Sequence, residues 1–258
     1  ANKALVIDTT VPTISSVSLA SDNSTLAVTF SEAVYTTTDA SSALVVGDFS
    51  FSISGGTATL SSATPSSISI SGNVYTLGIS LSGTPNGSET LTVVPASGTA
   101  IYDAAGNAAA ASQSNNTATL NEKIAPTMTI TAAEGADGFT SNDATLALTF
   151  TSSEATTDFA VGDITVTNGA LSDFAATSST VYTATLTPTA DGAATIDVAA
   201  STFTDAAGNN NTAAAQFNWT YDGTSPASPT ELVATPGNTQ VVLTWTANTE
   251  SDLASYKV

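Results

Sequence analysis

The segment Val181-Tyr182-Thr183-Ala184-Thr185-Leu186 decides the fold class, because its larger apolar side chains recur at alternate positions. Successive side chains of a strand point to opposite faces, so this alternation is typical of a half-buried β-strand. Similar runs recur at 26–30, 49–53 and 146–150, between turn-forming pairs such as Asn86-Gly87 and Asp191-Gly192. Helical periodicity is hard to find. The sequence therefore predicts an all-β protein of antiparallel β-sandwiches.

The charge of the chain is strongly negative. Three basic residues stand against 22 acidic ones, giving a net charge of −19 in 258 residues. Such a chain repels phosphate backbones and anionic lipid surfaces and attracts cations, so we expect no nucleic-acid partner. No apolar run approaches the roughly 20 residues of a membrane helix, so we expect no membrane insertion. The first residues lack a signal-peptide pattern and read as a mature or internal start.

Cysteine and histidine are both absent. Their absence excludes disulfides, thiolate catalysis, Ser-His-Asp chemistry and imidazole or thiolate metal sites. A hydrolase with a carboxylate pair is the one enzymatic reading that remains, and it would need an acid and a base about 5–10 Å apart in a cleft. The acidic residues instead recur from one repeat to the next, so we predict that the chain is not an enzyme.

An internal repeat sets the domain boundaries. An acidic residue stands four positions before a proline at Pro12, Pro126 and Pro226, and the pentapeptide Asp-Ala-Ala-Gly-Asn occurs at 103–107 and 205–209. These landmarks predict one domain over residues 1–121, a second over 122–222, and a linker with an incomplete third module over 223–258. About 30 residues cannot close a sandwich, so we expect the chain to be a piece of a longer protein.

The repeated motifs carry a family resemblance. From Glu122 to Asp222 the chain resembles the bacterial Ig-like (Big) repeats of secreted adhesins and surface proteins, through Pro126-Thr127, residues 162–169, residues 182–188 and Asp205 to Asn209. Residues 8–121 resemble a more divergent relative. The resemblance implies tandem immunoglobulin-like sandwiches that serve as structural or adhesive spacers of an extracellular bacterial surface protein.

The segment 227–258 is similar to the start of a fibronectin type III domain, with Leu232, Trp245 and Tyr256 at that family's core positions. Its proposed strands are Leu232, residues 241–245 and residues 256–258. Trp219, Trp245 and the tyrosines form either a sugar-stacking platform or part of the cores. We favour the core interpretation, because sandwich cores routinely bury such residues.

If each repeat is a seven-stranded Ig-like sandwich, three places in its chain share one pole: the segment before the first strand, the loop after the second strand and the loop before the last strand. Oxygen-bearing side chains recur at all three. We refer to this end as the N-terminal pole. In the first domain the residues are Asp8, Glu32, Asp48, Asp103 and Asn107, and in the second they are Glu122, Glu154, Asp163, Asp205 and Asn209.

Clustered carboxylates repel one another, and a hard divalent cation removes the conflict. Calcium suits such a site because it accepts six to eight oxygens in flexible geometry, whereas magnesium demands strict octahedral packing. The competing interpretation is turn chemistry, in which Asp and Asn bond nearby backbone and Gly takes a positive φ. Because the set of acidic and amide residues recurs in the same order, we predict structural calcium at the N-terminal pole of each of the two domains. Asp222, with Glu250 or Asp252, is the candidate third copy.

Two other functions remain open at this stage. The domains are accessory parts of a larger secreted enzyme if a catalytic domain lies elsewhere in the parent protein. Alternatively, the chain is a subunit of a self-assembling surface layer or extracellular filament, in which it contacts further copies of itself and another chain's strand completes the third module. For a spacer, the expected partners are the neighbouring domains of the same chain.

Overall fold

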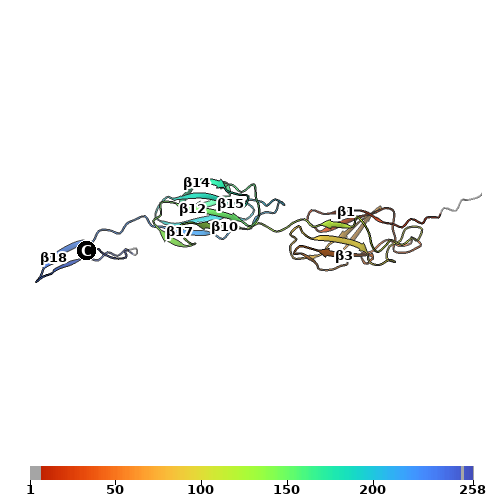
Figure 1. Ribbon diagram of the computed structural model, residues 1–258, viewed down its shortest axis with the longest axis horizontal. Coiled ribbons are helices and arrows are strands. Elements are labelled where there is room, and N and C mark those ends of the chain that lie inside the picture. The colour runs from red at the N-terminus through yellow and green to blue at the C-terminus, as the bar shows by residue number, and fades with distance from the viewer. Residues whose placement is uncertain (1–6, 251–252, 258) are drawn as a thin grey trace, which may run out of the picture. The chain divides into compact units, whose positions relative to one another are not determined.

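The computed structural model describes residues 7–250 and 253–257, and β-strands dominate this part of the chain (Figure 1). Contacts divide the chain into two compact units, Ala1–Ala125 with Ala207–Asn209, and Pro126–Ala206 with Asn210–Val258. Each unit contains one β-sandwich. Within the described residues, no helix has the length and apolar character needed to cross a membrane. The all-β prediction is confirmed.

The first sandwich packs a four-stranded sheet, in the order β1-β2-β6-β5, against a three-stranded sheet, β3-β8-β9, with a small ribbon β4-β7 at the side. All pairs in it are antiparallel. The strands are β1 Ile14–Leu19, β2 Thr25–Phe30, β3 Phe49–Ser54, β4 Thr59–Leu60, β5 Ile68–Ser71, β6 Val74–Gly78, β7 Leu81–Ser82, β8 Thr90–Pro95 and β9 Thr117–Thr119.

The second sandwich repeats this plan with two four-stranded sheets, β10-β12-β15-β14 and β11-β17-β16-β13. A short 3-10 turn leads into one strand of the second sheet in both sandwiches, η1 Val46–Asp48 before β3 and η2 Val161–Asp163 before β13. The strands are β10 Met128–Ala132, β11 Phe139–Ser141, β12 Leu146–Ser152, β13 Ile164–Thr167, β14 Gly169–Ala176, β15 Val181–Pro188, β16 Gly192–Val198 and β17 Phe217–Tyr221.

One pair departs from the predicted antiparallel pattern. Strand β11 runs parallel to β17, with Phe139 opposite Trp219 and Ser141 opposite Tyr221. The chain crosses from the first sheet to the second between β10 and β11, so a strand near the start of the domain lies beside its last strand. Sequence alternation indicates which face of a strand is buried but not which neighbour it pairs with.

The strand alternation places the large apolar residues between the sheets of each sandwich. Leu146, Leu148 and Phe150 of β12 are at most 1% exposed, and the residues between them face outward. Trp219 is 1% exposed, which confirms the core interpretation for this residue. Tyr182 lies edge-to-face on Phe159, with ring centroids 5.0 Å apart.

Both sandwiches share one tyrosine contact. The Tyr75 hydroxyl donates to the backbone carbonyl of Val34 at 3.1 Å, and the Tyr182 hydroxyl donates to that of Thr156 at 2.8 Å. In the first sandwich this bond ties β6 to the loop after β2, and in the second it ties β15 to the loop after β12. Burial raises the pKa of both tyrosines, so both remain protonated donors at neutral pH.

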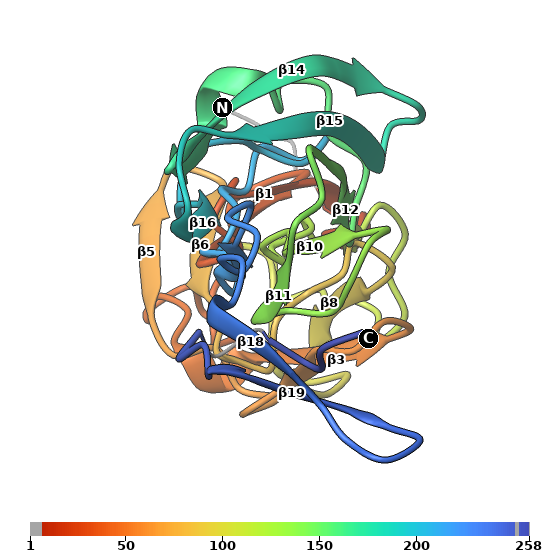
Figure 2. The ribbon, with the colours of Figure 1, turned by 90° about the vertical axis from the view of Figure 1, so that its left-hand side faces the viewer.

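The segment after Tyr221 forms a separate hairpin, β18 Thr230–Pro236 with β19 Val241–Thr246 (Figure 2). The two strands match the first two predicted for the third module, whereas residues 253–257 form no strand and Val258 lies outside the described residues. No described residue of this segment is buried. The contact-based boundary after Ala125 lies four residues beyond the predicted one, and the division into three domains stays a prediction.

Candidate metal centre

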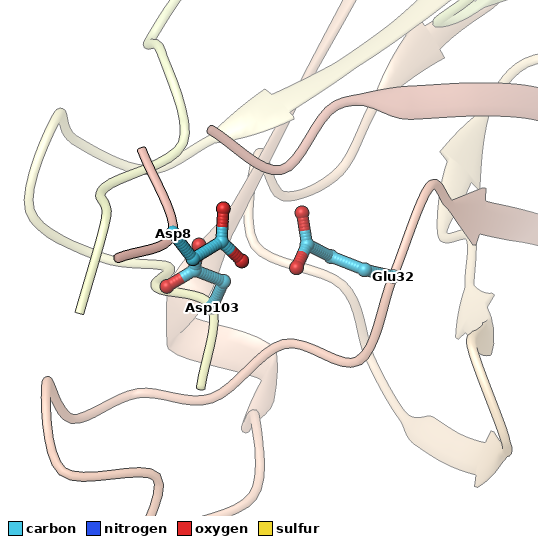
Figure 3. Close-up of side chains that lie close together, drawn as sticks. All are labelled: Asp8, Glu32 and Asp103. Atoms are coloured by element: carbon cyan, nitrogen blue, oxygen red, sulfur yellow. The ribbon is translucent and has the colours of Figure 1, made fainter. Parts of the chain in front are cut away.

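Three carboxylates from distant parts of the first sandwich meet at its N-terminal pole. Asp8 precedes β1, Glu32 follows β2, and Asp103 lies in the Asp-Ala-Ala-Gly-Asn segment between β8 and β9. Each offers an oxygen that lies within 4.8 Å of the other two. Figure 3 shows the three side chains directed toward one another. We refer to these three residues as the first acidic cluster.

Asp103 is held in place by its own turn and is fully buried, at 0% exposure. Its Oδ1 accepts the N–H groups of Ala105 at 2.9 Å and Asn107 at 2.8 Å, and its Oδ2 accepts Asn107 Nδ2 at 2.7 Å. Burial acts to raise the pKa of Asp103, but the hydrogen bonds from Asn107 and the neighbouring backbone outweigh it and lower that pKa. Asp103 is therefore a fixed, ionised member of the cluster.

Among the three carboxylates, Glu32 is the one whose ionised form the arrangement disfavours. Burial raises the pKa of its carboxyl, and the negative charges of Asp103 and Asp8 raise it further. The charges that act on Glu32 are thus both of its own sign. A cation at this position would reverse the sign of the field that Glu32 experiences.

Asn107 connects the cluster to the segment before β1. Its Nδ2 donates to the backbone carbonyls of Asp8 at 3.2 Å and Thr10 at 3.3 Å, in addition to Asp103 Oδ2. Asp8 Oδ1 accepts the Thr10 N–H at 2.9 Å, which closes a local turn. Asn107 therefore joins the Asp103 carboxylate to the backbone of the segment that carries Asp8.

Asp48 and Asp163, both included in the predicted ligand sets, make a different and mutually equivalent contact. Asp48 Oδ2 accepts the Val45 N–H at 2.7 Å, and Asp163 Oδ2 accepts the Ala160 N–H at 2.8 Å. Each thereby closes the 3-10 turn that leads into the next strand. Neither belongs to a group of three converging carboxylates among the described residues. Burial raises the pKa of Asp48.

The predicted residues of the second copy are divided between the two compact units. Glu154 and Asp205 belong to the second unit, and their carboxylate oxygens lie within 4.8 Å of each other. Asp205 is 7% exposed, so it repeats the burial of Asp103. Glu122 and Asn209 are assigned to the first unit, where Asn209 Nδ2 and the Ile124 N–H both donate to the Glu122 carboxylate.

The candidate third calcium site, at Asp222 with Glu250 or Asp252, has a different geometry from the first acidic cluster. The Asp222 N–H donates to the Ser141 carbonyl at 3.0 Å, which extends the β11–β17 pair, and Asp222 lines an open polar cavity of about 290 Å³. Glu250 Oε1 accepts the Ala227 N–H at 3.1 Å, and Asp252 lies outside the described residues. Among the residues that the structure describes, Asp222 joins no group of three carboxylates.

Asp158 and Glu89 are among the partnered acids that the sequence analysis did not single out. Asp158 Oδ1 and Oδ2 accept the Thr204 N–H at 3.0 and 3.1 Å, and its Oδ2 accepts the Thr204 hydroxyl at 2.8 Å, which fastens the loop after β12 to the Asp-Ala-Ala-Gly-Asn segment. Glu89 is 0% exposed at the start of β8. Glu89 shares the odd numbering of inward-facing Leu91 and Val93, so strand alternation could have revealed it; Asp158 carries no comparable signal.

The donor atoms of the first acidic cluster define its chemistry. Carboxylate oxygens, with backbone carbonyls close by, suit a hard divalent cation. Three loops contribute one carboxylate each, a flexible set that fits calcium better than the strict octahedron of magnesium. Hydrogen bonds already fix Asp103 and Asp8, so Glu32 is the member whose charge is least compensated. The residues present therefore fit calcium.

Comparison with known families identifies the second sandwich. Residues 122–221 match the family model of the bacterial Ig-like domain. The match covers one sandwich and does not extend to residues 1–121 or to residues 223–258. A comparison with curated proteins found no match. Residues 122–221 are therefore similar to the bacterial Ig-like domain family.

Proposed function

We propose that the chain is a spacer of an extracellular bacterial surface protein, in which calcium binds at the N-terminal pole of each sandwich and fixes the preceding segment. The match of residues 122–221 to the bacterial Ig-like domain supports the surface role. The convergence of Asp8, Glu32 and Asp103 carries the calcium part. In this role the partners are neighbouring domains of the same chain.

Calcium acts on the orientation of the segment before β1. Asp8 lies in that segment, whereas Glu32 and Asp103 belong to the body of the sandwich. A cation shared by the three carboxylates replaces repulsion with attraction and joins the segment to the body. The same chemistry is repeated by Glu154 and Asp205 in the second sandwich. The fold therefore serves to hold a spacing and a direction, not to transform a substrate.

We expect calcium to raise the melting temperature of the first sandwich. Extracellular calcium modules bind with Kd near 10⁻⁴–10⁻³ M, so millimolar calcium adds about 1–2 kcal/mol per site. For a domain of this size that is an increase of about 5–10 °C. Differential scanning calorimetry in calcium, in magnesium and in chelator measures it, with a smaller increase expected in magnesium.

Matched variants separate binding from simple charge removal. Glu32→Gln and Asp8→Asn are expected to abolish most of the rise in melting temperature that calcium produces. In chelator, Glu32→Gln is expected to melt at the parent's temperature or above it, because the variant removes a repulsion between carboxylates. Asp22→Asn is the control, since Asp22 is an exposed acid in the β1–β2 turn that contacts Ser24. Equal melting temperatures in calcium and chelator for the parent chain would rule out the calcium site.

A further inference from the structure

Two Asn-Gly pairs occur in the chain, Asn86-Gly87 in the first sandwich and Asn168-Gly169 in the second. The first pair lies in the loop between β7 and β8, and the second connects β13 to β14. Glycine has no Cβ to hinder the approach of its backbone nitrogen to the preceding side chain, so such a pair is open to spontaneous deamidation. The two pairs share this local chemistry, but the folded chain surrounds them differently.

Deamidation of an Asn-Gly pair forms a ring and releases ammonia. The glycine nitrogen loses its proton to hydroxide and attacks the asparagine Cγ, which closes a five-membered succinimide. The bond from Cγ to Nδ2 breaks, and the amide nitrogen takes a proton from water and leaves as ammonia. Water then opens the ring at either carbonyl and yields aspartate or isoaspartate. The solvent supplies every reagent, and one amide becomes one carboxylate.

Three hydrogen bonds fix the Asn168 side chain. Its Nδ2 donates to the carbonyls of Ala190 at 2.8 Å and Gly192 at 3.3 Å, and its Oδ1 accepts the Ala190 N–H at 3.2 Å. The Asn168 amide thus holds the β15–β16 turn, and Gly169 begins β14 opposite Pro188. Ring closure expels Nδ2, so its two bonds must break first. The folded second sandwich therefore protects Asn168.

The Asn86 side chain lacks this protection at its leaving nitrogen. Its Oδ1 accepts the Ser88 N–H at 3.0 Å, a bond that stabilises the negative charge developing on this oxygen when Cγ is attacked. Asn168 Oδ1 has a comparable donor, so the difference between the two lies at Nδ2. Within the described part of the chain, nothing accepts a hydrogen bond from Asn86 Nδ2. Asn86 and Gly87 are only half-buried, so water and hydroxide reach them.

We propose that Asn86 deamidates spontaneously in the folded chain, whereas Asn168 is protected. The product changes the surroundings of the fully buried Glu89, because the Asn86 N–H donates to both Glu89 oxygens at 3.1 Å. Aspartate adds a second negative charge to this loop, and isoaspartate also lengthens the backbone before Gly87 by one methylene. The first sandwich therefore weakens with age while the second stays intact. This property goes beyond the spacer role and does not depend on calcium.

Peptide mapping of the full chain during storage tests the proposal. The folded chain is kept in mildly alkaline buffer with chelator, then denatured and cleaved at its lysines. Cleavage after Lys123 places Asn86 and Asn168 in different peptides, and fragmentation in the mass spectrometer locates the residue that gains mass. We expect Asn86 to react at least about tenfold faster than Asn168, because the Nδ2 bonds of Asn168 must break before it reacts.

The same chain stored in urea is the reference. There we expect similar rates at the two asparagines, because each is followed by glycine and neither is held by the fold. A folded chain in which Asn168 reacts as fast as Asn86 would overturn the proposal, and so would reaction of Asn86 in urea alone. Asn86→Gln is the chemical control, since glutamine keeps the backbone N–H but would need a six-membered ring. We expect this variant to keep its amide through the same storage.

Two further variants test the effect on the first sandwich. Asn86→Asp introduces the new charge without waiting for the reaction, and Asn115→Asp is the matched control because Asn115 is an exposed asparagine of the same sandwich. We expect Asn86→Asp to lower the melting temperature of the first sandwich by about 5 °C and Asn115→Asp to change it by less than about 2 °C. Equal melting temperatures of the two variants would contradict the predicted weakening.

Discussion

Glu89→Gln is expected to destabilise the first sandwich by about 2–4 kcal/mol, a large part of the stability of an ordinary domain. Glu89 is fully buried, and its Oε1 accepts the N–H groups of Thr57 at 2.8 Å, Ala58 at 2.9 Å and Asn86 at 3.1 Å. A glutamine amide replaces one oxygen by a donor and removes the charge that strengthens these bonds. Urea unfolding of the first sandwich measures the loss.

Glu134→Gln is the matched control for this variant. Both Glu134 oxygens accept the Ala147 N–H at 3.0 Å, but the side chain is exposed, so water replaces the lost bonds. We expect a change within about 0.5 kcal/mol for it. A similar effect of the two variants would show that the burial of Glu89 does not matter.

The same carboxylate makes the first sandwich sensitive to acid. Burial acts to raise the pKa of Glu89, but the N–H groups of Ala58, Asn86 and Thr57 outweigh it and lower that pKa to about 2. A group with a depressed folded pKa stabilises the protein above its unfolded pKa, near 4.5. That contribution, about 2–3 kcal/mol, is lost as the pH falls from about 4.5 toward 2.

Unfolding of the first sandwich at pH 5 and at pH 2.5 measures this loss. Glu89→Gln does not titrate in this range, so we expect the variant to lose less stability than the parent between the two pH values. An identical pH dependence in parent and variant would show that other carboxyl groups are responsible.

Trp219→Ala is expected to destabilise the second sandwich by about 3–5 kcal/mol, because it removes the largest fully buried side chain. The indole stacks on Phe139, with ring centroids 6.2 Å apart, and packs against Tyr221 at 5.5 Å. Its loss also leaves Ser141 Oγ without the indole donor. Calorimetry should show one of the two sandwich transitions shifted and the other unchanged, since the two cores share no residue.

Trp245→Ala is the matched control, because Trp245 contacts Tyr256 in the hairpin segment and belongs to neither core. We expect it to leave both sandwich transitions within about 0.5 kcal/mol of the parent. If Trp219→Ala shifted both transitions equally, the two sandwiches would not fold as separate units.

The sequence predicted the strands well where one face of the strand is apolar and the other is polar. The runs at 26–30, 49–53, 146–150 and 181–186 lie within β2, β3, β12 and β15. The alternating pattern is enough for this, because each inward residue is chosen by the same local requirement for burial. The parallel β11–β17 pair was not predicted, since it joins Phe139 to Trp219 across most of the domain sequence.

The acidic residues likewise include some whose role the sequence predicted and some whose role it did not. Repetition of Asp-Ala-Ala-Gly-Asn led to Asp103 and Asp205, and both are buried. The same reasoning grouped Asp48 with Asp103, although the structure uses Asp48 to close a turn three residues long. An aspartate before a strand is equally compatible with either role, because both need only an oxygen near a backbone turn.

By itself the sequence determined the all-β class, the inward faces of the strands at 26–30, 49–53, 146–150 and 181–186, and the two-fold repetition of the domain landmarks. Only the tertiary structure decided that Asp8, Glu32 and Asp103 meet while Asp48 does not, that Glu89 is buried, and that β11 lies beside β17. The physical reason is the distance along the chain over which each feature is determined. Alternation and turns are set by neighbours in the chain, whereas a carboxylate's charge, burial and partners depend on segments that only the packed sheets bring together.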